Sequence, residues 1–262
     1  MINYKLSRNI VYIVIFCYNL STGSHYYGLF KIKVLISMEK GSKNLFRNEH
    51  GNIYSSLKYI ESLNIHNKNK IIDIGCRYGS LLYNLYRKGY NDIYGIDKNI
   101  KTISEGKIKY NSISERLMHY KGNEIPFDDN SFDVILMFDV IEHIPNINRF
   151  ISDQVYRILK PGGIFIFQTP NKFINVPWSI IATKSFTKYK KWHCSLQNYF
   201  SLKKLLKEAK FNNVIIEKYN IITKHNKNKV RDRFGSIGVF FLKLASKLPL
   251  YLYPNFWGNC KK

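Results

Sequence analysis

Between residues 70 and 219, short apolar runs alternate regularly with amphipathic segments, a pattern that few folds accommodate. Runs rich in Ile, Val and Phe predict strands at 70–74, 91–96, 118–121, 132–138, 164–168 and 213–219. Apolar residues three or four positions apart predict helices at 52–63, 80–88, 100–108, 149–159, 202–209 and 235–250. Strands that alternate with helices form βαβ units, so the sequence predicts an α/β fold. We expect a doubly wound, mostly parallel sheet with helices on both faces.

The length of 262 residues suits one α/β domain with a segment at each end. We place the domain at residues 38–235, because Met38 opens a polar stretch that would make a natural start. Residues 1–37 are interpreted as a poorly structured or mis-assigned extension. Its apolar run at 10–18 is shorter than the about 20 residues that span a bilayer. A short membrane-surface anchor is the alternative for this extension.

The carboxyl-terminal part, residues 236–262, is predicted to form an apolar helix and a tail. Packing on the domain is the commoner outcome for such a helix. The alternative is contact with a membrane surface, with Lys243 and Lys247 toward the lipid headgroups. Residues 253–262 are short and irregular, so they do not clearly predict a strand.

The chain is strongly basic, with 41 Lys and Arg residues against 18 Asp and Glu and a net charge of +23. Such a charge favours a polyanionic partner, either nucleic acid or an anionic membrane. The basic residues are scattered, however, and no ribonucleoprotein motif accompanies them. Lys, Asn, Ile and Tyr are abundant together, as in proteins of AT-rich genomes. We therefore attribute most of the charge to composition and do not favour nucleic acid as the partner.

The four cysteines lie far apart and form no C-x-x-C pair. This spacing supports neither a zinc site nor a disulfide framework, so we expect the protein in a reducing compartment, the cytoplasm. Association with a membrane surface is compatible with that location.

A glycine-containing turn, DIGCRYG at residues 73–79, follows the first expected strand. In a doubly wound sheet, ligands bind at the carboxyl ends of the strands where the winding reverses. Asp97 ends the second strand, 18 residues beyond Gly79, where a carboxylate can accept hydrogen bonds from both ribose hydroxyls of a nucleotide. Asp97 can also cap the helix that follows.

The glycine spacing of this turn distinguishes a dinucleotide site from a site for a cationic amino-acid ligand. A dinucleotide site needs G-x-G-x-x-G to seat a pyrophosphate. This turn has only Gly75 and Gly79, with the acidic Asp73 before them. A carboxylate at this point suits a cationic amino-acid ligand better than a diphosphate, which places an NAD-dependent dehydrogenase last among the alternatives.

With these residues in place, the chain resembles the class I S-adenosylmethionine (SAM)-dependent methyltransferases, whose fold is a Rossmann-like sheet. The turn at 73–79 resembles their glycine-rich motif. Further stretches match that family in order, at 125–134, 140–144, 159–163, 169–171 and from His193 to Leu202. The resemblance covers about residues 45–220.

The resemblance implies which residues bind the cofactor. They are Asp73, Gly75, Cys76, Gly79, Asp97, Asn123, Glu124 and Phe138. Asp73, Gly75 and Gly79 are expected to border the methionine half of SAM, and Asp97 to hold the ribose. Asn123 or Glu124 takes the position that contacts the adenine, and Phe138 approaches the cofactor. Arg77 stands where the family usually has glycine, so we expect its side chain to point outward and the turn to be shifted.

Methyl transfer itself requires little from the protein, because the sulfonium is already an activated donor. The enzyme aligns the acceptor and excludes water, and a hydroxyl acceptor also needs a base or a metal. Glu142 and His143 follow the fourth expected strand, and His193 lies fifty residues further on. We take these three residues as the catalytic candidates.

The same region offers a candidate metal site. Asp139, Glu142 and His143 stand at positions i, i+3 and i+4, which share one face of a helical turn, and His193 would complete the set. The arrangement is similar to the E-x-x-E-H motif with a distant His of small-RNA 2′-O-methyltransferases and ubiquinone-pathway O-methyltransferases. Glu-His after the fourth strand also occurs in methyltransferases that bind no metal, and we favour that interpretation.

We therefore expect SAM-dependent O-methylation of a hydroxyl on a small-molecule, glycan or lipid-precursor acceptor. Peripheral membrane contact would suit a lipid-linked acceptor. One alternative is a metal-dependent RNA 2′-O-methyltransferase. The other is a non-catalytic SAM-fold binding protein, which Arg77 in the glycine turn would favour.

Overall fold

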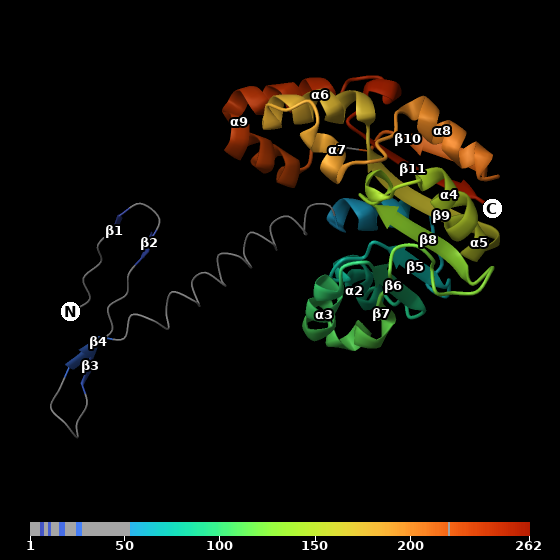
Figure 1. Ribbon diagram of the computed structural model, residues 1–262, viewed down its shortest axis with the longest axis horizontal. Helices are drawn as coiled ribbons and strands as arrows, with labels where there is room; N and C mark the ends of the chain where they lie inside the picture. The colour runs from blue at the N-terminus through green and yellow to red at the C-terminus, as the bar shows by residue number, and fades with distance from the viewer. Residues whose placement is uncertain (1–5, 8–9, 12–15, 19–24, 28–52, 220) are drawn as a thin grey trace. The chain divides into compact units, whose positions relative to one another are not determined.

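A seven-stranded sheet forms the centre of residues 53–262 in this computed structural model, which describes residues 6–7, 10–11, 16–18, 25–27, 53–219 and 221–262. The strand order is β10-β11-β9-β8-β5-β6-β7 (Figure 1). Five strands run parallel to one another: β5 (Ile71–Ile74), β6 (Ile93–Asp97), β7 (Leu117–His119), β8 (Phe132–Phe138) and β9 (Leu159–Pro170). The winding reverses between β5 and β8, which confirms the predicted doubly wound α/β fold.

Helices cover both faces of the sheet because alternate residues of each buried strand point to opposite sides. On one face, Ile71, Val134 and Leu136 pack with the helix at 53–62, α2 (Ser80–Arg87) and α3 (Ile100–Lys109). On the other face, Ile72 and Ile135 pack with the helical segment at 147–158 and with α8 (Tyr199–Glu208). That segment comprises α4 (Ile147–Phe150), η3 (Ile151–Val155) and α5 (Tyr156–Ile158). A short η1 (Asn111–Arg116) precedes β7.

The sheet is completed by the closing antiparallel strand that the sequence did not clearly predict. β11 (Asn255–Lys261) lies between β9 and β10 (Asn212–Glu217) and is antiparallel to both. Gly258 has no side chain to collide there, since a Cβ would overlap the carbonyl oxygen of Ile215 and the ring of Phe167. Buried Asn259 donates a 3.4 Å hydrogen bond to the hydroxyl of Tyr59. Residues 255–261 thus belong to the same sheet as the strands of the domain that the sequence analysis placed at residues 38–235.

Two further differences from the sequence-based expectation concern β9 and α9. Residues 160–163, between the helix predicted at 149–159 and the strand predicted at 164–168, form an irregularity inside β9, where the pairing jumps from Phe132–Leu159 to Val134–Ile164. The helix predicted at 235–250 begins earlier, as α9 (Lys224–Ala245), and bends at Gly235, whose φ is 63° and ψ −155°. No helix among the described residues is long and apolar enough to cross a membrane.

Three helices leave the carboxyl edge of the sheet and gather together at the top of Figure 1. α6 (Lys172–Thr183) and α7 (Lys188–Trp192) follow β9, and α9 follows β10. We call α6, α7 and α9 the cap. The sequence did not predict α6 or α7. A short η4 (Leu250–Leu252) then leads into β11.

Residues 1–52 form a separate unit. Within it, β1 (Leu6–Ser7) pairs with β2 (Ile10–Val11), and β3 (Phe16–Tyr18) pairs with β4 (His25–Tyr27). The rest of the extension predicted at 1–37, and its interpretation, lie outside the described residues.

Candidate active site

The turn after β5 packs against the end of β6 and against the segment that follows β8. Gly75 and Gly79 have φ values of 82° and 80°, which glycine adopts without strain. The backbone N–H groups of Gly75 and Cys76 both donate to the carbonyl of Ile96, at 2.8 and 3.1 Å. A Cβ at Gly75 would overlap Cγ2 of Val140, in the segment after β8. Glycine is therefore required here by packing as well as by backbone conformation.

Arg77 adopts a left-handed backbone with φ 51° inside this turn. Its side chain is exposed, as expected for a side chain that points outward, and its guanidinium lies 5.8 Å from the centre of the Tyr78 ring. Glycine would adopt the same backbone more easily, whereas Arg77 must accept a cost. The turn accommodates the arginine without bringing its side chain into the core.

Two buried carboxylates, Asp73 and Asp97, lie at the carboxyl ends of β5 and β6. The oxygens of Asp97 accept hydrogen bonds from the backbone N–H groups of Arg77 (2.9 Å) and Asn99 (2.8 Å). Asn99, not Asp97, caps α3, because its side chain accepts from the backbone of Lys101 and Thr102. Asp97 therefore ties the two turns together and is not the cap that we considered.

Burial and, to a smaller extent, the nearby charge of Asp97 together raise the pKa of Asp73 to about 8. A carboxylate in such a place gains from a cationic neighbour, which would favour its ionised form. Cys76 is buried in the core cluster behind the turn, and burial raises the pKa of its thiol. Any contact of Cys76 with a ligand in the turn would come from its backbone.

The other expected cofactor residues lie on neighbouring strand ends. Asn123 and Glu124 are exposed in the segment after β7. Phe138 is half-buried at the end of β8, where its ring lies 5.6 Å from that of Trp257 in β11. The structure thus places all eight residues at the carboxyl ends of β5, β6, β7 and β8 or in the segments that follow these strands.

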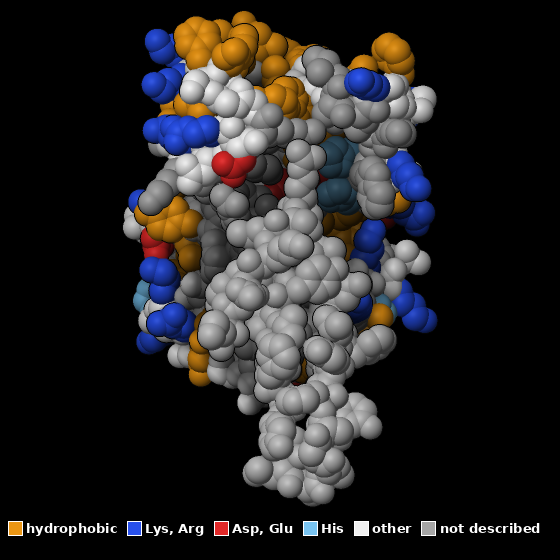
Figure 2. Space-filling view, turned by 90° about the vertical axis from the view of Figure 1, so that its left-hand side faces the viewer, with side chains coloured by type: hydrophobic (Ala, Val, Ile, Leu, Met, Phe, Trp, Pro, Cys, Tyr) orange, Lys and Arg blue, Asp and Glu red, His pale blue; other side chains and the backbone are white. Residues whose placement is uncertain are grey.

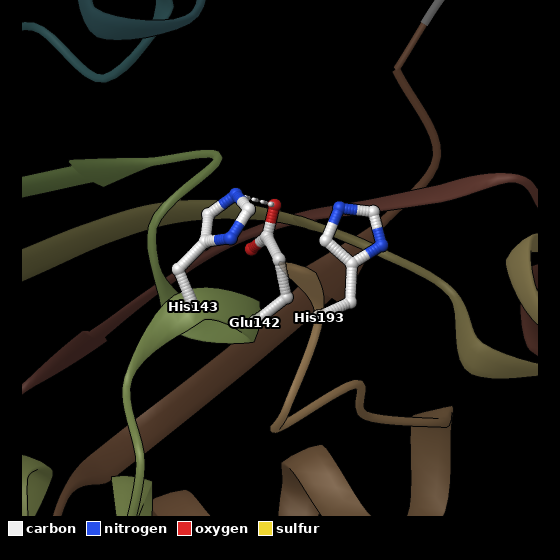
Figure 3. A group of neighbouring side chains, drawn as sticks. All are labelled: Glu142, His143 and His193. Atoms are coloured by element: carbon white, nitrogen blue, oxygen red, sulfur yellow. Dashed lines mark ion pairs between the residues drawn. The ribbon is translucent and has the colours of Figure 1, made fainter. Parts of the chain in front are cut away.

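A second group of side chains lies after β8, where Glu142, His143 and His193 converge (Figure 3). One ligand atom from each lies within 4.8 Å of the other two. Nε2 of His143 is 3.8 Å from Oε1 of Glu142, and the ring centres of the two histidines are 5.0 Å apart. Glu142 and His143 belong to η2 (Ile141–His143), whereas His193 directly follows α7 of the cap.

Backbone contacts explain how residues fifty positions apart meet. The N–H of Ser195 donates to the carbonyl of Glu142 at 3.0 Å, and the Ser195 hydroxyl donates to the carbonyl of Ile144 at 2.6 Å. Thr169 at the end of β9 donates its hydroxyl hydrogen to Oε2 of Glu142 at 3.1 Å. The sequence offered Thr169 only as part of a motif and gave no signal for Ser195.

Burial and neighbouring charge set the protonation of this group. Glu142 is 2% exposed, and burial, together with the charge of Asp139, raises its pKa to about 8. Burial lowers the pKa of His193, and so does the charge of His143. Nδ1 of His193 is buried and has no hydrogen-bond partner among the described residues.

Asp139 is not a member of this group. The proposal that it shares a helical turn with Glu142 and His143 assumed helical backbone, but Asp139 has a φ of 54° and η2 begins only at Ile141. Asp139 acts on Glu142 through its charge. The structure thus brings together three of the four candidate metal ligands.

Known proteins share both this sequence pattern and this fold. A family model described as a methyltransferase domain matches residues 44–215. Ubiquinone biosynthesis O-methyltransferase of Rickettsia canadensis is 32% identical over 111 residues, which are 40% of this chain and 44% of that protein. The enzyme of the same name from Pelagibacter ubique is 32% identical over 156 residues, 52% of this chain and 63% of that protein. The chain thus spans about half the length of these relatives.

The fold is also found in a solved S-adenosylmethionine-dependent methyltransferase of Mesorhizobium loti. It superimposes with a TM-score of 0.59 at 14% identity and covers 79% of this chain and 98% of that one. The order of the strands, the glycine turn and the match of the family model over most of the chain agree with one another. The chain therefore belongs to the class I SAM-dependent methyltransferases.

Proposed function

We propose that this methyltransferase transfers a methyl group to a hydroxyl of a small-molecule acceptor, a class in which we include glycan and lipid precursors. The observation that carries the proposal is the convergence of Glu142, His143 and His193 within 4.8 Å of one another. A hydroxyl loses its proton as it is methylated, so O-methylation needs a proton acceptor. Imidazole is well suited to that role near neutral pH. Two relatives named ubiquinone biosynthesis O-methyltransferases also support an oxygen acceptor.

The turn after β5 fits SAM. Burial and the charge of Asp97 raise the pKa of Asp73, and the cationic groups that SAM carries would favour the ionised carboxylate. We assign the methionine half of SAM to Asp73, Gly75 and Gly79, and the ribose to Asp97. Asn123 or Glu124 would meet the adenine, and Phe138 would approach the cofactor. When bound, SAM supplies a methyl group that its sulfonium has already activated.

Within the second group, His193 is the residue best prepared to take a proton. Its lowered pKa keeps the imidazole neutral at pH 7, and its buried Nδ1 is without a partner among the described residues. His143 lies beside it, with the ring centres 5.0 Å apart, and can share the proton. Glu142, held by Thr169, orients the two rings.

Methyl transfer from isotope-labelled SAM to phenols, sugars and their lipid-linked forms tests the proposal. His193→Ala should lower the rate by about 100-fold or more, since general base catalysis contributes on that scale. His66→Ala, at an exposed histidine, is the matched control and should not change the rate. The affinity for SAM, measured by calorimetry, should be the same in the unaltered protein and in both variants. Methylation of nitrogen acceptors alone would disprove the proposal.

A second candidate function uses the same side chains as ligands of a divalent metal. It is favoured by Nδ1 of His193, which has no hydrogen-bond partner in the described part of the chain and lies beside a carboxyl group and a second imidazole, a donor set that suits Zn²⁺. Glu142, His143 and His193 would hold the ion, which would lower the pKa of the acceptor hydroxyl.

A chelator separates the two functions. EDTA should abolish activity of the metal enzyme, and added Zn²⁺ or Mg²⁺ should restore it, whereas the metal-free enzyme should be unaffected. If the acceptor is the 2′-hydroxyl of an RNA, RNA binding should also fall steeply with salt. A small-molecule enzyme should show little salt dependence.

A further inference from the structure

The apolar stripe of α9 faces outward. Ile237, Phe240, Phe241 and Leu244 stand at positions i, i+3, i+4 and i+7, so they share one side of the helix. In this order, the four residues are 70, 63, 59 and 52% exposed. Such a stripe ordinarily faces a core. Packing of the tail on its own domain, the commoner outcome, therefore does not hold for this side of α9.

A neighbouring helix extends the stripe. Trp178 of α6 lies against Phe234 of α9, with ring centres 5.1 Å apart, and both residues are exposed. Figure 2 shows hydrophobic side chains gathered at the top of the molecule, where Figure 1 places α6 and α9, with Lys and Arg side chains beside them. We use the name apolar surface for these six residues: Trp178, Phe234, Ile237, Phe240, Phe241 and Leu244.

The bend at Gly235 brings Arg231 and Lys243 to a hollow that Phe240 of the apolar surface also lines. Beyond the bend, Gly238 packs so closely that a Cβ would lie 2.7 Å from Cγ1 of Val230, in the first half of the helix. The two halves of α9 thus lie against each other. Between them is a hollow of about 240 Å³, lined by Arg231, Ser236, Val239, Phe240 and Lys243.

The helix that carries most of the apolar surface is basic in sequence. The sequence of α9 contains six Lys or Arg residues and a single acidic residue, Asp232. Arg231 and Lys243 are exposed at the hollow, and Lys247 is exposed just after the helix. Guanidinium and ammonium groups bind phosphate oxygens strongly. A stripe of Ile, Leu and Phe bordered by cations is the pattern of a helix that lies in a membrane interface.

We propose that the apolar surface docks on an anionic lipid bilayer, with α9 in the plane of the interface and with Arg231 and Lys243 on headgroup phosphates. An apolar stripe alone would also suit a protein partner, but the cations that border it select an anionic bilayer. The docking helices belong to the cap, and His193 directly follows α7 of the cap. Docking would hold the enzyme at the surface that carries a lipid-borne acceptor, an inference that rests on the proposed O-methylation, whereas the docking itself does not.

Vesicle flotation of the full chain tests the docking. The protein should float with vesicles of phosphatidylcholine mixed with phosphatidylglycerol, and far less with phosphatidylcholine alone. Added salt should weaken the binding, because it screens the cations. Ile237→Gln should lower the partition onto mixed vesicles by about tenfold, since it removes an apolar side chain from the buried face. Arg231→Glu combined with Lys243→Glu should remove the preference for anionic lipid.

Ile108→Gln is the matched control, because Ile108 is an isoleucine that is 83% exposed on α3, outside the cap. It should float like the unaltered protein. Equal binding to both kinds of vesicle, equal loss in Ile237→Gln and Ile108→Gln, or no flotation at all would overturn the docking. Calorimetry of SAM binding on each variant reports whether it is folded. A protein that floats but methylates no hydroxyl would refute the proposed function and leave the docking intact.

Discussion

The hydroxyl of Thr169 donates a 3.1 Å hydrogen bond to Oε2 of Glu142, and both side chains are buried. The bond joins the end of β9 to η2, the two segments that border the histidine pair. In the proposed reaction we expect Thr169 to act as a positioning residue, because it holds the side chain of Glu142 beside the two imidazoles.

Thr169→Val should remove this hydrogen bond with little change in volume. We expect kcat for methyl transfer to fall by about tenfold, the scale of one buried hydrogen bond, with SAM affinity unchanged. Thr169→Ser keeps the hydroxyl and should restore most of kcat. Steady-state kinetics of the two variants checks this, and an equal loss in both would point to packing instead of the hydrogen bond.

Gly75→Ala should destabilise the protein by about 2–4 kcal/mol. The substitution adds backbone strain at φ 82° to an overlap with Val140. Gly162 has a φ of 75° but nothing within 4 Å of its Cβ position, so Gly162→Ala should cost only about 1 kcal/mol. Urea unfolding measures both. Val140→Ala should recover part of the loss at Gly75, and no recovery would show that backbone strain alone matters.

Asp97→Ala should weaken SAM binding by about tenfold or more, because it leaves the backbone N–H groups of Arg77 and Asn99 without their acceptor and removes the proposed ribose contact. Asp97→Asn keeps one acceptor oxygen and should lose less. Asp128→Ala, at an exposed carboxylate, serves as the control in calorimetry. Unchanged affinity in Asp97→Ala would remove Asp97 from the cofactor site.

SAM binding should strengthen as the pH rises toward 8. The pKa of Asp73 is raised to about 8, so the free protein holds a proton there at neutral pH. A cationic ligand favours the ionised carboxylate, and binding below pH 8 should therefore release a proton. Calorimetry in buffers of different ionisation enthalpy counts that proton. Asp73→Asn should abolish the release, and an unaltered release in this variant would assign it to another group.

The same shift predicts a pH dependence of stability. The folded pKa of about 8 lies above the ordinary value of 3.8, so between these limits the folded state holds a proton that the unfolded state has lost. The free energy of unfolding should accordingly fall as the pH rises through this window. Asp73→Asn should flatten the slope in urea unfolding without SAM, and a slope that stays the same would contradict the raised pKa.

Asn171 connects the end of β9 to the segment before β11. Its side-chain amide donates to the carbonyls of Tyr251 (2.9 Å) and Tyr253 (2.8 Å), and its oxygen accepts from the N–H of Phe173. Asn171→Ala should lower the free energy of unfolding by about 2–4 kcal/mol, because it leaves buried groups unpaired. Asn99→Ala, at the exposed cap of α3, should cost only about 1 kcal/mol in the same urea unfolding experiment. Equal losses would mean that Asn171 acts only as a helix cap.

The sequence by itself determined the parts of the protein that local patterns encode. The alternation of apolar runs gave the parallel strands, because strands buried on both faces must be apolar throughout. The glycines and the acidic residue of the turn at 73–79, together with Asp97, marked a candidate ligand site, because the carboxyl ends of parallel strands share one edge. The family followed from the order of the motifs.

The tertiary structure alone decided the features that depend on distant partners. β11 contains Gly258 and Asn259, which are poor strand formers, and it is a strand because β9 and β10 pair with it on both sides. Asp139 lies outside the group formed by the other three candidate metal ligands because its left-handed backbone breaks the helical spacing. His193 lies beside Glu142 because the residues that follow it, among them Ser195, donate hydrogen bonds to the backbone of Glu142 and Ile144. The outward direction of the α9 stripe likewise comes from packing, since periodicity shows which residues share a face but not what that face meets.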